Sequence, residues 1–441
     1  MTGPAGARPT KPAAVTTTGA PQGQGLPQLW MPYTQMQTAA PPLQVARAEG
    51  VRIVLEDGRE LIDAIASWWT ACHGYGHPVI REAVQHQLEV MPHVMLGGLS
   101  HEPAQRLAAR LAAILPGDLD HVFFAESGSV AVEVAMKMAM QYYINRGERG
   151  RTRFISFRHG YHGDTLAAMS VCDPEEGMHA LFHGALLPQH VIDLPRGAEA
   201  VAAFEALLER ERTNVAAVIV EPLVQGAGGM KFHAPKDLAA LAAACQRQGV
   251  LWIADEIMTG FGRTGSLFAC EQAGVVPDII TLSKALTGGT LALSATVARR
   301  HIFEAFLDAD PERALMHGPT FMGNALACAA AHASLDLFER EPRLARVAEL
   351  GRLLCQGLEP CRGLSGVVDV RVRGAIGVVQ LEAPAPSAFF TPRALERGVW
   401  LRPFGDIVYT TPPFTISDAE LGRICETIVA VTVQWSEQAR G

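Results

Sequence analysis

The stretch 251-LWIADEIMTGFGRTGSLFACEQAGVVPDIITLSKALTGG-289 contains two short apolar runs, and a chemically active side chain follows each of them. The first run, LWIADEI, contains Asp255 and Glu256 at its end, and the second, PDIITLSK, ends in Lys284. Short apolar runs bounded by glycine and proline are typical of buried strands. The spacing therefore predicts two strands that carry a carboxylate and a lysine at neighbouring ends.

A lysine and a carboxylate in this arrangement suit one kind of chemistry. The lysine amine can form a Schiff base with an aldehyde cofactor, while the carboxylate pairs with the protonated nitrogen of the cofactor's ring. Either residue alone is more simply explained as a solvated lysine or as a helix cap. Together, with GFGRTG between them, Asp255 and Lys284 predict a site for pyridoxal 5′-phosphate (PLP).

Apolar runs and helical patterns continue to alternate on the N-terminal side of this stretch. HVFFA, RFISF and VAAVIV are separated by helical segments, which predicts an α/β fold with a mostly parallel sheet covered on both faces. Ligand sites in such sheets lie at the carboxyl ends of the strands. Ser127, Glu221, Asp255 and Lys284 all follow predicted strands, so we expect these side chains to converge.

Composition limits the class of protein. The 441 residues carry a formal net charge of −8, and 49% of them are apolar, which predicts a globular chain of two domains. The chain has no basic block, so we expect no nucleic-acid partner, and no apolar run that would span a membrane. The eight cysteines form no CxxC pair and predict buried free thiols in a reducing cytoplasm. We interpret residues 1–25 as a disordered tail.

Two further segments flank this core. VRIVLEDGRELIDA predicts a hairpin before the adjacent Trp68 and Trp69, which cannot both face one core from a regular element. His73 and His77 are four residues apart, but the glycines and the proline around them oppose a helical metal site, so we expect no metal. Beyond about residue 336 the pattern changes to a small α+β unit.

The segment DEIMTGFGRTG followed by DIITLSKALTGG resembles the signature of the class III PLP-dependent aminotransferases. The resemblance covers nearly the whole chain and includes MPYTQM, SWWTACHGYGHP, HGYHGDTLAAMSV and WLRPFGDIVYTTPP. These motifs are similar to the branch of the family that moves the amino group of S-adenosylmethionine to 8-amino-7-oxononanoate in biotin synthesis. The resemblance implies a fold type I homodimer with shared active sites. It implies a large PLP domain over residues 91–335 and a small domain from residues 26–90 and 336–441.

The resemblance also implies roles for individual residues. Lys284 is expected to hold the cofactor and carry the proton, Asp255 to pair with the ring nitrogen, and Tyr161 to cover the ring; these three form the expected catalytic set. The implied cofactor contacts are Gly128, Ser129, Tyr161, Glu221, Asp255, Ile257 and Lys284, together with Pro319 and Thr320 across the subunit interface. The implied substrate contacts are Tyr33, Trp68, Trp69, Tyr161, Asp164, Lys284, Gly318, Arg402 and Tyr409.

Tyr409 is the most discriminating position. Many class III members carry an arginine there, which binds the donor's carboxylate and pairs with the residue matching Glu221; a phenol cannot replace that guanidinium. Arg402 is instead expected to bind the carboxylate of 8-amino-7-oxononanoate. Three questions stay open: what Glu221 does, whether lysine could replace S-adenosylmethionine as the amino donor, and which tryptophan contacts which substrate. A PLP-sensing regulator would need a DNA-binding module, and a relative without catalysis would not need both Lys284 and Asp255.

Overall fold

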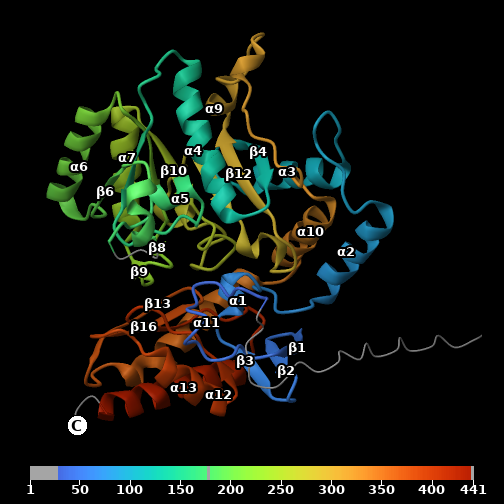
Figure 1. Cartoon of the computed structure of the whole chain (residues 1–441), viewed down its shortest axis with the longest axis vertical. Coiled ribbons are helices and arrows are strands. Elements are labelled where there is room, and N and C mark those ends of the chain that lie inside the picture. Colours follow the sequence, from blue (N-terminus) through green and yellow to red (C-terminus); the bar gives the residue numbers. More distant parts are fainter. Residues whose placement is uncertain (1–27, 176–178, 439–441) are drawn as a thin grey trace, which may run out of the picture.

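The computed structural model describes residues 28–175 and 179–438, so the predicted disordered tail lies outside the described residues. Figure 1 shows two bodies, one above the other. The upper body surrounds a seven-stranded sheet, and the lower one combines strands from near the N-terminus with strands and helices from the C-terminal part of the chain. The bounds predicted for the two domains stay a prediction.

The seven-stranded sheet has the order β4-β12-β11-β10-β7-β5-β6. Its neighbours run parallel except β12, which is antiparallel to both β11 and β4. This confirms the predicted mostly parallel sheet. The strands span Leu119–Ala125 (β4), Arg153–Phe157 (β5), His190–Ile192 (β6), Val215–Val220 (β7), Leu251–Asp255 (β10), Ile279–Leu282 (β11) and Ser294–Arg299 (β12).

Three smaller sheets complete the strand inventory of the described residues. They have the orders β1-β2-β3-β15, β13-β14-β16 and β8-β9. The predicted hairpin is present as the antiparallel pair β2 and β3. The strands span Val45–Glu49 (β1), Arg52–Leu55 (β2), Glu60–Asp63 (β3), Val224–Gln225 (β8), Lys231–Phe232 (β9), Val367–Arg373 (β13), Ile376–Leu381 (β14), Val399–Trp400 (β15) and Ile407–Thr410 (β16).

Helices cover the sheets, with α4 packed across β12, β11 and β7, and α7 packed on β10. The helices span Ala66–Trp69 (α1), Pro78–Val90 (α2), Glu102–Ile114 (α3), Gly128–Asn145 (α4), Leu166–Ser170 (α5), Gly197–Glu211 (α6), Pro235–Gln248 (α7), Cys270–Ala273 (α8), Arg300–Glu304 (α9), Ala325–Arg340 (α10), Arg343–Leu358 (α11), Ser387–Glu396 (α12) and Asp418–Gln438 (α13). Short 3₁₀ turns span Ala180–Ala185 (η1), Lys284–Thr287 (η2), Pro311–Arg313 (η3) and Glu359–Cys361 (η4).

Strand β10 shows why the sheet needs helices on both faces. All five of its residues are buried, and they alternate between two hydrophobic clusters. Leu251 and Ile253 pack in the cluster that contains α4, whereas Trp252 and Ala254 pack in the larger cluster on the other face. Because neither face meets water, the first four residues of the strand are apolar. The polar residue, Asp255, comes last, at the carboxyl end of the strand.

The segment labelled α1 is a left-handed turn. Its four residues, Ala66, Ser67, Trp68 and Trp69, have φ values of 47°, 46°, 53° and 73°. Left-handed backbone costs an L-residue about 1–2 kcal/mol, so the surrounding structure has to hold this turn in place. Asp63 does so by accepting hydrogen bonds from the main-chain N–H groups of Ile65 at 2.9 Å and Ser67 at 3.0 Å.

Two predictions about composition meet the structure differently. All eight cysteines are free thiols, as predicted, but Cys355 on α11 is exposed rather than buried. The apolar surroundings of Cys355 in the sequence belong to the buried face of an amphipathic helix, and the thiol lies on the other face. None of the described helices combines the length and the apolar character needed to cross a membrane.

Candidate active site

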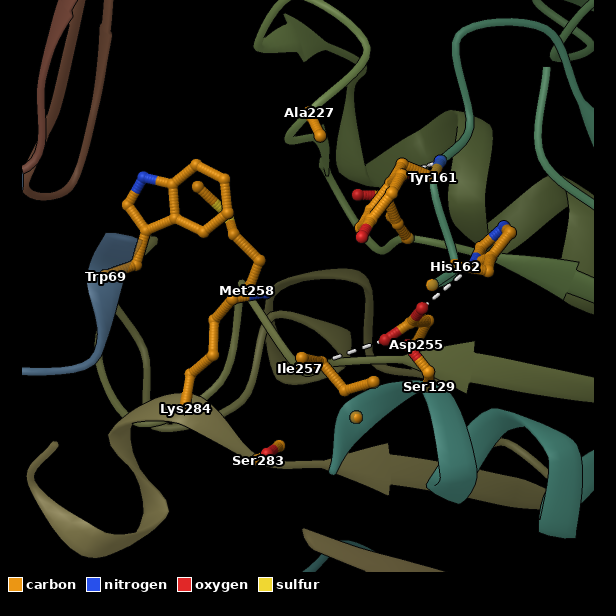
Figure 2. A pocket seen from close by; sticks show the side chains of 13 residues that line it. Trp69, Ser129, Tyr161, His162, Ala227, Asp255, Ile257, Met258, Ser283 and Lys284 are labelled. Atoms are coloured by element: carbon orange, nitrogen blue, oxygen red, sulfur yellow. Dashed lines mark hydrogen bonds and ion pairs between the residues drawn. The ribbon is translucent and has the colours of Figure 1, made fainter. Parts of the chain in front are cut away.

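A cavity of about 140 Å³ lies at the carboxyl ends of the central strands. Figure 2 shows Lys284 and Trp69 on one side of it and Asp255 and Tyr161 on the other. Asp255 ends β10, and Lys284 begins η2 two residues after β11. The predicted residues that line the cavity together are Trp69, Gly128, Ser129, Tyr161, Glu221, Asp255, Ile257 and Lys284.

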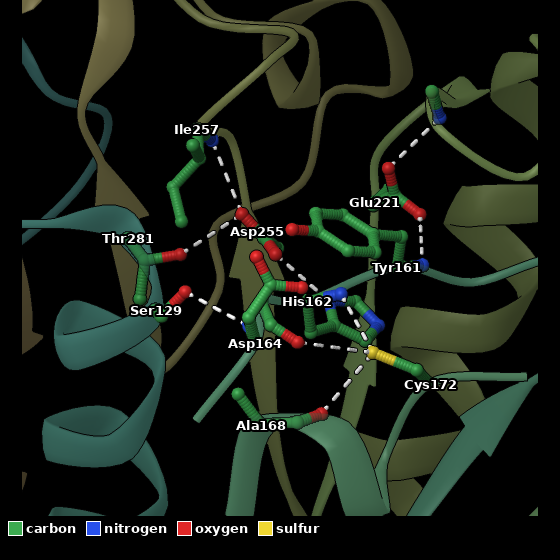
Figure 3. A network of polar contacts seen from close by, with 12 residues as sticks. Ser129, Tyr161, His162, Asp164, Ala168, Cys172, Glu221, Asp255, Ile257 and Thr281 are labelled. Carbon is green, nitrogen blue, oxygen red and sulfur yellow. Dashed lines mark hydrogen bonds and ion pairs between the residues drawn. The ribbon is translucent and has the colours of Figure 1, made fainter. Parts of the chain in front are cut away.

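The Asp255 carboxylate is fixed by three hydrogen bonds. Its Oδ2 atom lies 2.7 Å from His162 Nδ1, and its Oδ1 atom accepts from the Ile257 N–H at 3.1 Å and the Thr281 hydroxyl at 3.2 Å. Asp255 and His162 are both buried, and Figure 3 shows the imidazole reaching the carboxylate from the β5–α5 loop. A carboxylate held this way has one orientation and can keep a proton on a ring nitrogen in front of it.

The Lys284 amine is buried in an apolar setting that disfavours its charge. Burial lowers its pKa below the ordinary range, and the nearby carboxylates Asp255 and Glu221 oppose that shift. The Lys284 Nζ lies 4.8 Å from the centre of the Trp69 ring. Its φ of 45° is left-handed, a strained conformation that clusters at functional sites. A lysine with a lowered pKa has more of the neutral amine needed for attack and proton transfer.

Helix α4 begins at the cavity and offers a site for an anion. Its N-cap is Ser127, whose hydroxyl accepts from the Val130 N–H at 3.3 Å. At Gly128 an added Cβ would lie 3.0 Å from Ile257 Cδ1, so a side chain there would crowd the cavity. Because the first N–H groups of a helix point outward, the start of this 18-residue helix suits a phosphate.

These features can be tested against PLP, which needs a phosphate site, an acid for its ring nitrogen and an amine for its aldehyde. The start of α4, the oriented Asp255 and the buried Lys284 all line the same cavity. Ile257 lies beside Gly128, where it can pack on a flat ring. The residues present therefore fit a phosphorylated pyridine aldehyde.

A second layer of side chains surrounds the mouth of this cavity. The Tyr33 hydroxyl donates to Asp164 Oδ2 at 2.6 Å and lies 3.3 Å from the Tyr161 hydroxyl. His179 Nε2 lies 2.8 Å from the other oxygen of Asp164, and this contact is the main cause of the lowered pKa of Asp164. Burial raises the pKa of Tyr33 to about 12. Tyr33 and Asp164, both predicted from distant motifs, thus meet beside Tyr161.

Arg402 and Trp68 continue this layer from Tyr33. The guanidinium carbon of Arg402 lies 4.7 Å from the centre of the Trp68 ring, and Trp68 packs edge-on against Tyr33 with ring centres 6.4 Å apart. Arg402 makes no ion pair within residues 28–175 and 179–438. A stacked guanidinium without a partner acid is suited to the carboxylate of a ligand. Tyr409 is buried, and the centre of its ring lies 6.5 Å from the centre of the Trp69 ring.

The loop with Gly318, Pro319 and Thr320 is not brought to the cavity of its own chain. None of the three lines the cavity, Gly318 and Thr320 are exposed, and Phe321 is 60% exposed. The Thr320 carbonyl lies 3.0 Å from His93 Nε2. Their predicted contact with a phosphate across the subunit interface therefore stays a prediction.

Sequence reasoning assigned no role to several residues that the structure places at the site, among them His162, Thr281 and Met258. His162 directly follows Tyr161, so its position next to a predicted site residue was a weak signal. Thr281 was detectable only as a polar residue within an otherwise apolar strand. Met258 lines the cavity, but nothing in its local pattern separates it from a core methionine.

Comparison with known proteins agrees with this geometry. Residues 33–432 match the family model described as aminotransferase class-III. The chain is similar to the adenosylmethionine-8-amino-7-oxononanoate aminotransferase of Mycobacterium leprae, with 48% identity over 91% of this chain and 94% of the relative. The enzyme of the same name from Corynebacterium glutamicum is 45% identical over 91% of this chain and 96% of the relative.

Solved structures give the same result. The adenosylmethionine-8-amino-7-oxononanoate aminotransferase of Methanocaldococcus jannaschii superposes with a TM-score of 0.87 at 34% identity, covering 92% of this chain and 97% of that one. A PLP-bound amine transaminase from an uncultivated Pseudomonas species superposes with a TM-score of 0.86 at 32% identity, covering 93% and 100%. The sheet topology, the cavity and these matches lead to one conclusion: the chain is a fold type I protein that belongs to the class III aminotransferases.

Proposed function

We propose that this chain uses PLP to transfer the amino group of S-adenosylmethionine to 8-amino-7-oxononanoate, giving 7,8-diaminononanoate, a step of biotin synthesis. The observation that carries this proposal is the single cavity in which Lys284, Asp255 and the start of α4 meet. The similarity at 48% identity to an enzyme named for these two substrates supports the choice of substrates. The reaction is ping-pong, because one amino group is released to the enzyme before the second substrate takes it.

The cofactor would be held by residues from four different elements. Asp255 would face the ring nitrogen, Ile257 one face of the ring, and Gly128 and Ser129 the phosphate at the start of α4. Lys284 would hold the aldehyde end. When bound, PLP supplies an electron sink that stabilises the negative charge left on a substrate carbon after it loses a proton.

Lys284 and Asp255 then have separate tasks. Asp255, fixed by His162 and Thr281, holds a proton on the ring nitrogen, which keeps the ring electron-poor. Lys284 Nζ would take the proton from the substrate carbon that bears the nitrogen and return it to the cofactor carbon on the other side of that nitrogen. The burial that lowers the Lys284 pKa leaves more of the amine neutral and able to act as a base. Trp69, beside the amine, helps to exclude water from this transfer.

The second layer selects the substrates. Arg402, stacked on Trp68, binds the carboxylate at the far end of 8-amino-7-oxononanoate. Tyr33, Trp68 and Tyr161 provide the aromatic wall along its aliphatic chain. Buried Tyr409 leaves this position without a guanidinium, which disfavours donors that need an arginine for their carboxylate.

A homodimer with shared sites forms part of the proposal. The exposed apolar side chains of Met316 and Phe321 flank the loop that carries Gly318, Pro319 and Thr320, and such exposed groups favour a protein contact. A partner subunit that covers this loop would bring its own Thr320 to the phosphate. We also retain a cytoplasmic location, because all eight cysteines are free thiols.

A donor screen tests the proposal. The PLP-loaded protein is mixed with S-adenosylmethionine, lysine or ornithine alone, and the loss of absorbance from the cofactor's aldehyde form is followed. S-adenosylmethionine should convert the cofactor fully, and the converted protein should then be restored by 8-amino-7-oxononanoate. Conversion by lysine or ornithine but not by S-adenosylmethionine would replace the proposed donor.

A further inference from the structure

Glu221 is a buried carboxylate of the cavity wall that forms no ion pair with any described side chain. It follows β7 and is 5% exposed. Its Oε2 accepts from the Tyr161 N–H at 3.0 Å, and its Oε1 accepts from the Gly226 N–H at 2.8 Å. Among the described side chains, Glu221 forms no ion pair. Since a carboxylate has about four acceptor positions, roughly half of its capacity is unused where it meets the cavity.

Glu256 shows what a purely structural carboxylate looks like in this fold. It too is buried, but it accepts from the Ala269 and Cys270 N–H groups, each at 2.8 Å, and from the Thr259 hydroxyl at 2.9 Å. It does not line the cavity. Its acceptors are thus used to hold the following loop, whereas those of Glu221 face the space where substrates react.

The shape of the cavity decides which part of each substrate reaches Glu221. Trp68 and Arg402 do not line the cavity that holds Lys284, so a substrate arm that reaches Arg402 runs outward from the reacting carbon. The short substituent on the reacting carbon then points inward. In 8-amino-7-oxononanoate this substituent is a carbon that bears a methyl and an ammonium group. In S-adenosylmethionine it is a carboxylate.

We propose that Glu221 recognises this short substituent in both halves of the reaction: as a carboxylate it binds the ammonium next to the acceptor's ketone, and as a neutral acid it donates to the donor's carboxylate. This inference rests on the proposed function. Burial raises the pKa of Glu221 to about 7, with His162 lowering it and Asp255 raising it further, so both forms exist near neutral pH. Lys284 is the other charged group of the cavity that senses Glu221.

The test compares two ketones that differ only in this ammonium. The protein loaded with pyridoxamine 5′-phosphate, the form that accepts ketones, is mixed with increasing 8-amino-7-oxononanoate or 7-oxononanoate, and the apparent Kd is read from how the first-turnover absorbance change saturates, apart from its maximal rate. A charge-assisted hydrogen bond makes the wild type bind the amino ketone about 10- to 100-fold more tightly. In Glu221→Gln this preference should fall below about threefold. Glutamine still donates an N–H, so the rate of the donor half-reaction should change by less than about threefold.

Two controls separate recognition from structure. Glu256→Gln swaps an oxygen for an amide at a buried carboxylate that also accepts two main-chain hydrogen bonds, and it should keep the full preference for the amino ketone. Asp164→Asn tests the rival carboxylate, which accepts from Tyr33 in the second layer: it can change the affinity for both ketones, but the preference for the amino ketone should remain. If Glu221→Gln does not fold, Glu221→Asp, which withdraws the carboxylate from the cavity, should show the same loss of preference.

Several outcomes would overturn the role of Glu221. These are an equal preference for both ketones in the wild type, a loss of preference in Asp164→Asn instead, or a Glu221→Gln variant whose two half-reactions slow equally. None of these outcomes argues against the proposed function, which is amino transfer from S-adenosylmethionine to 8-amino-7-oxononanoate. Failure of S-adenosylmethionine to convert the wild-type cofactor would refute the proposed function itself.

Discussion

The inner and outer walls of the active site differ in how far one chain completes them. The inner wall holds Asp255 and His162, which are buried and hydrogen-bonded to each other, and Lys284, which is largely withdrawn from water within one protomer. The outer wall has Trp68 and Tyr33 at 36% and 50% exposure, and Arg402, which forms no ion pair with any described residue. The difference indicates that a single chain provides the groups for the cofactor chemistry. The exposed side chains of the outer wall are the ones that a substrate or a partner subunit can contact.

Removing the inner-wall amine should have the largest effect. Lys284→Ala deletes both the group that holds the aldehyde and the base, so turnover should fall by at least about 10⁴-fold. The absorbance of the bound lysine–cofactor adduct should disappear as well. Lys236→Ala, which removes an exposed lysine from α7 outside the cavity, should leave both signals in place. Steady turnover by Lys284→Ala would show that the inner wall is not the reaction centre.

Next in size is the loss of the carboxylate or of its support. Asp255→Ala should lower kcat by about 10²- to 10⁴-fold, because the ring nitrogen loses the acid that keeps it protonated. His162→Phe keeps the ring shape but removes the 2.7 Å contact, and should cost about tenfold. The two changes should not be additive, because His162 acts through Asp255. Additive losses in the double variant would indicate an independent role for His162.

A mixed dimer tests whether the outer wall is completed across the interface. Thr320→Glu would place a negative charge at the partner's phosphate site and should inactivate the enzyme, as Lys284→Ala does. When the two inactive variants are mixed and reassorted, half of the dimers are hybrids with one intact site, so about a quarter of the wild-type activity should return. A mixture that stays inactive would show that each site is built from one chain.

Changes confined to the outer wall should be milder and should act on binding. Arg402→Ala should raise KM for 8-amino-7-oxononanoate by about 10- to 100-fold, the value of a charge-assisted pair, and should hardly change the donor half-reaction. Arg402→Lys should restore only part of this, since an ammonium cannot make the planar contact with Trp68. An equal effect on both substrates would mean that Arg402 supports the fold of the pocket instead.

The smallest expected effect is on stability: carboxyl groups of the two walls should contribute to folding in opposite ways as pH changes. The raised pKa of Glu221, about 7 in the folded chain, means that it favours folding at low pH and that this contribution is lost as pH rises through 7. The pKa of Asp164 is lowered, so its contribution is present above its unfolded pKa and is lost as pH falls. Melting of the cofactor-free protein should therefore depend less on pH above 5 in Glu221→Gln, and less below 5 in Asp164→Asn.

The sequence predicted the inner wall better than the outer one, for a physical reason. Asp255 and Lys284 end apolar strands, and strand ends in a parallel sheet share one edge, so a local pattern was sufficient to bring them together. The contact of His162 with Asp255 joins residues 93 positions apart and depends on side-chain direction. The predicted phosphate contact of Thr320 involves a second copy of the chain, which no pattern within one sequence places. The left-handed turn at Trp68 and Trp69 contains no glycine, the residue that usually indicates such a backbone in a sequence.

That turn has a consequence for the order in which the protein folds. Four left-handed residues at about 1–2 kcal/mol each cost roughly 4–8 kcal/mol, which approaches the entire net stability of an ordinary domain. The turn of Ala66–Trp69 can therefore form only after β3 and the strands around it are in place. It should also be the first part to open, and hydrogen exchange should find its amides among the least protected in the ordered chain. Because the Trp69 ring lies against the Lys284 amine, opening of this turn would also expose that amine to solvent.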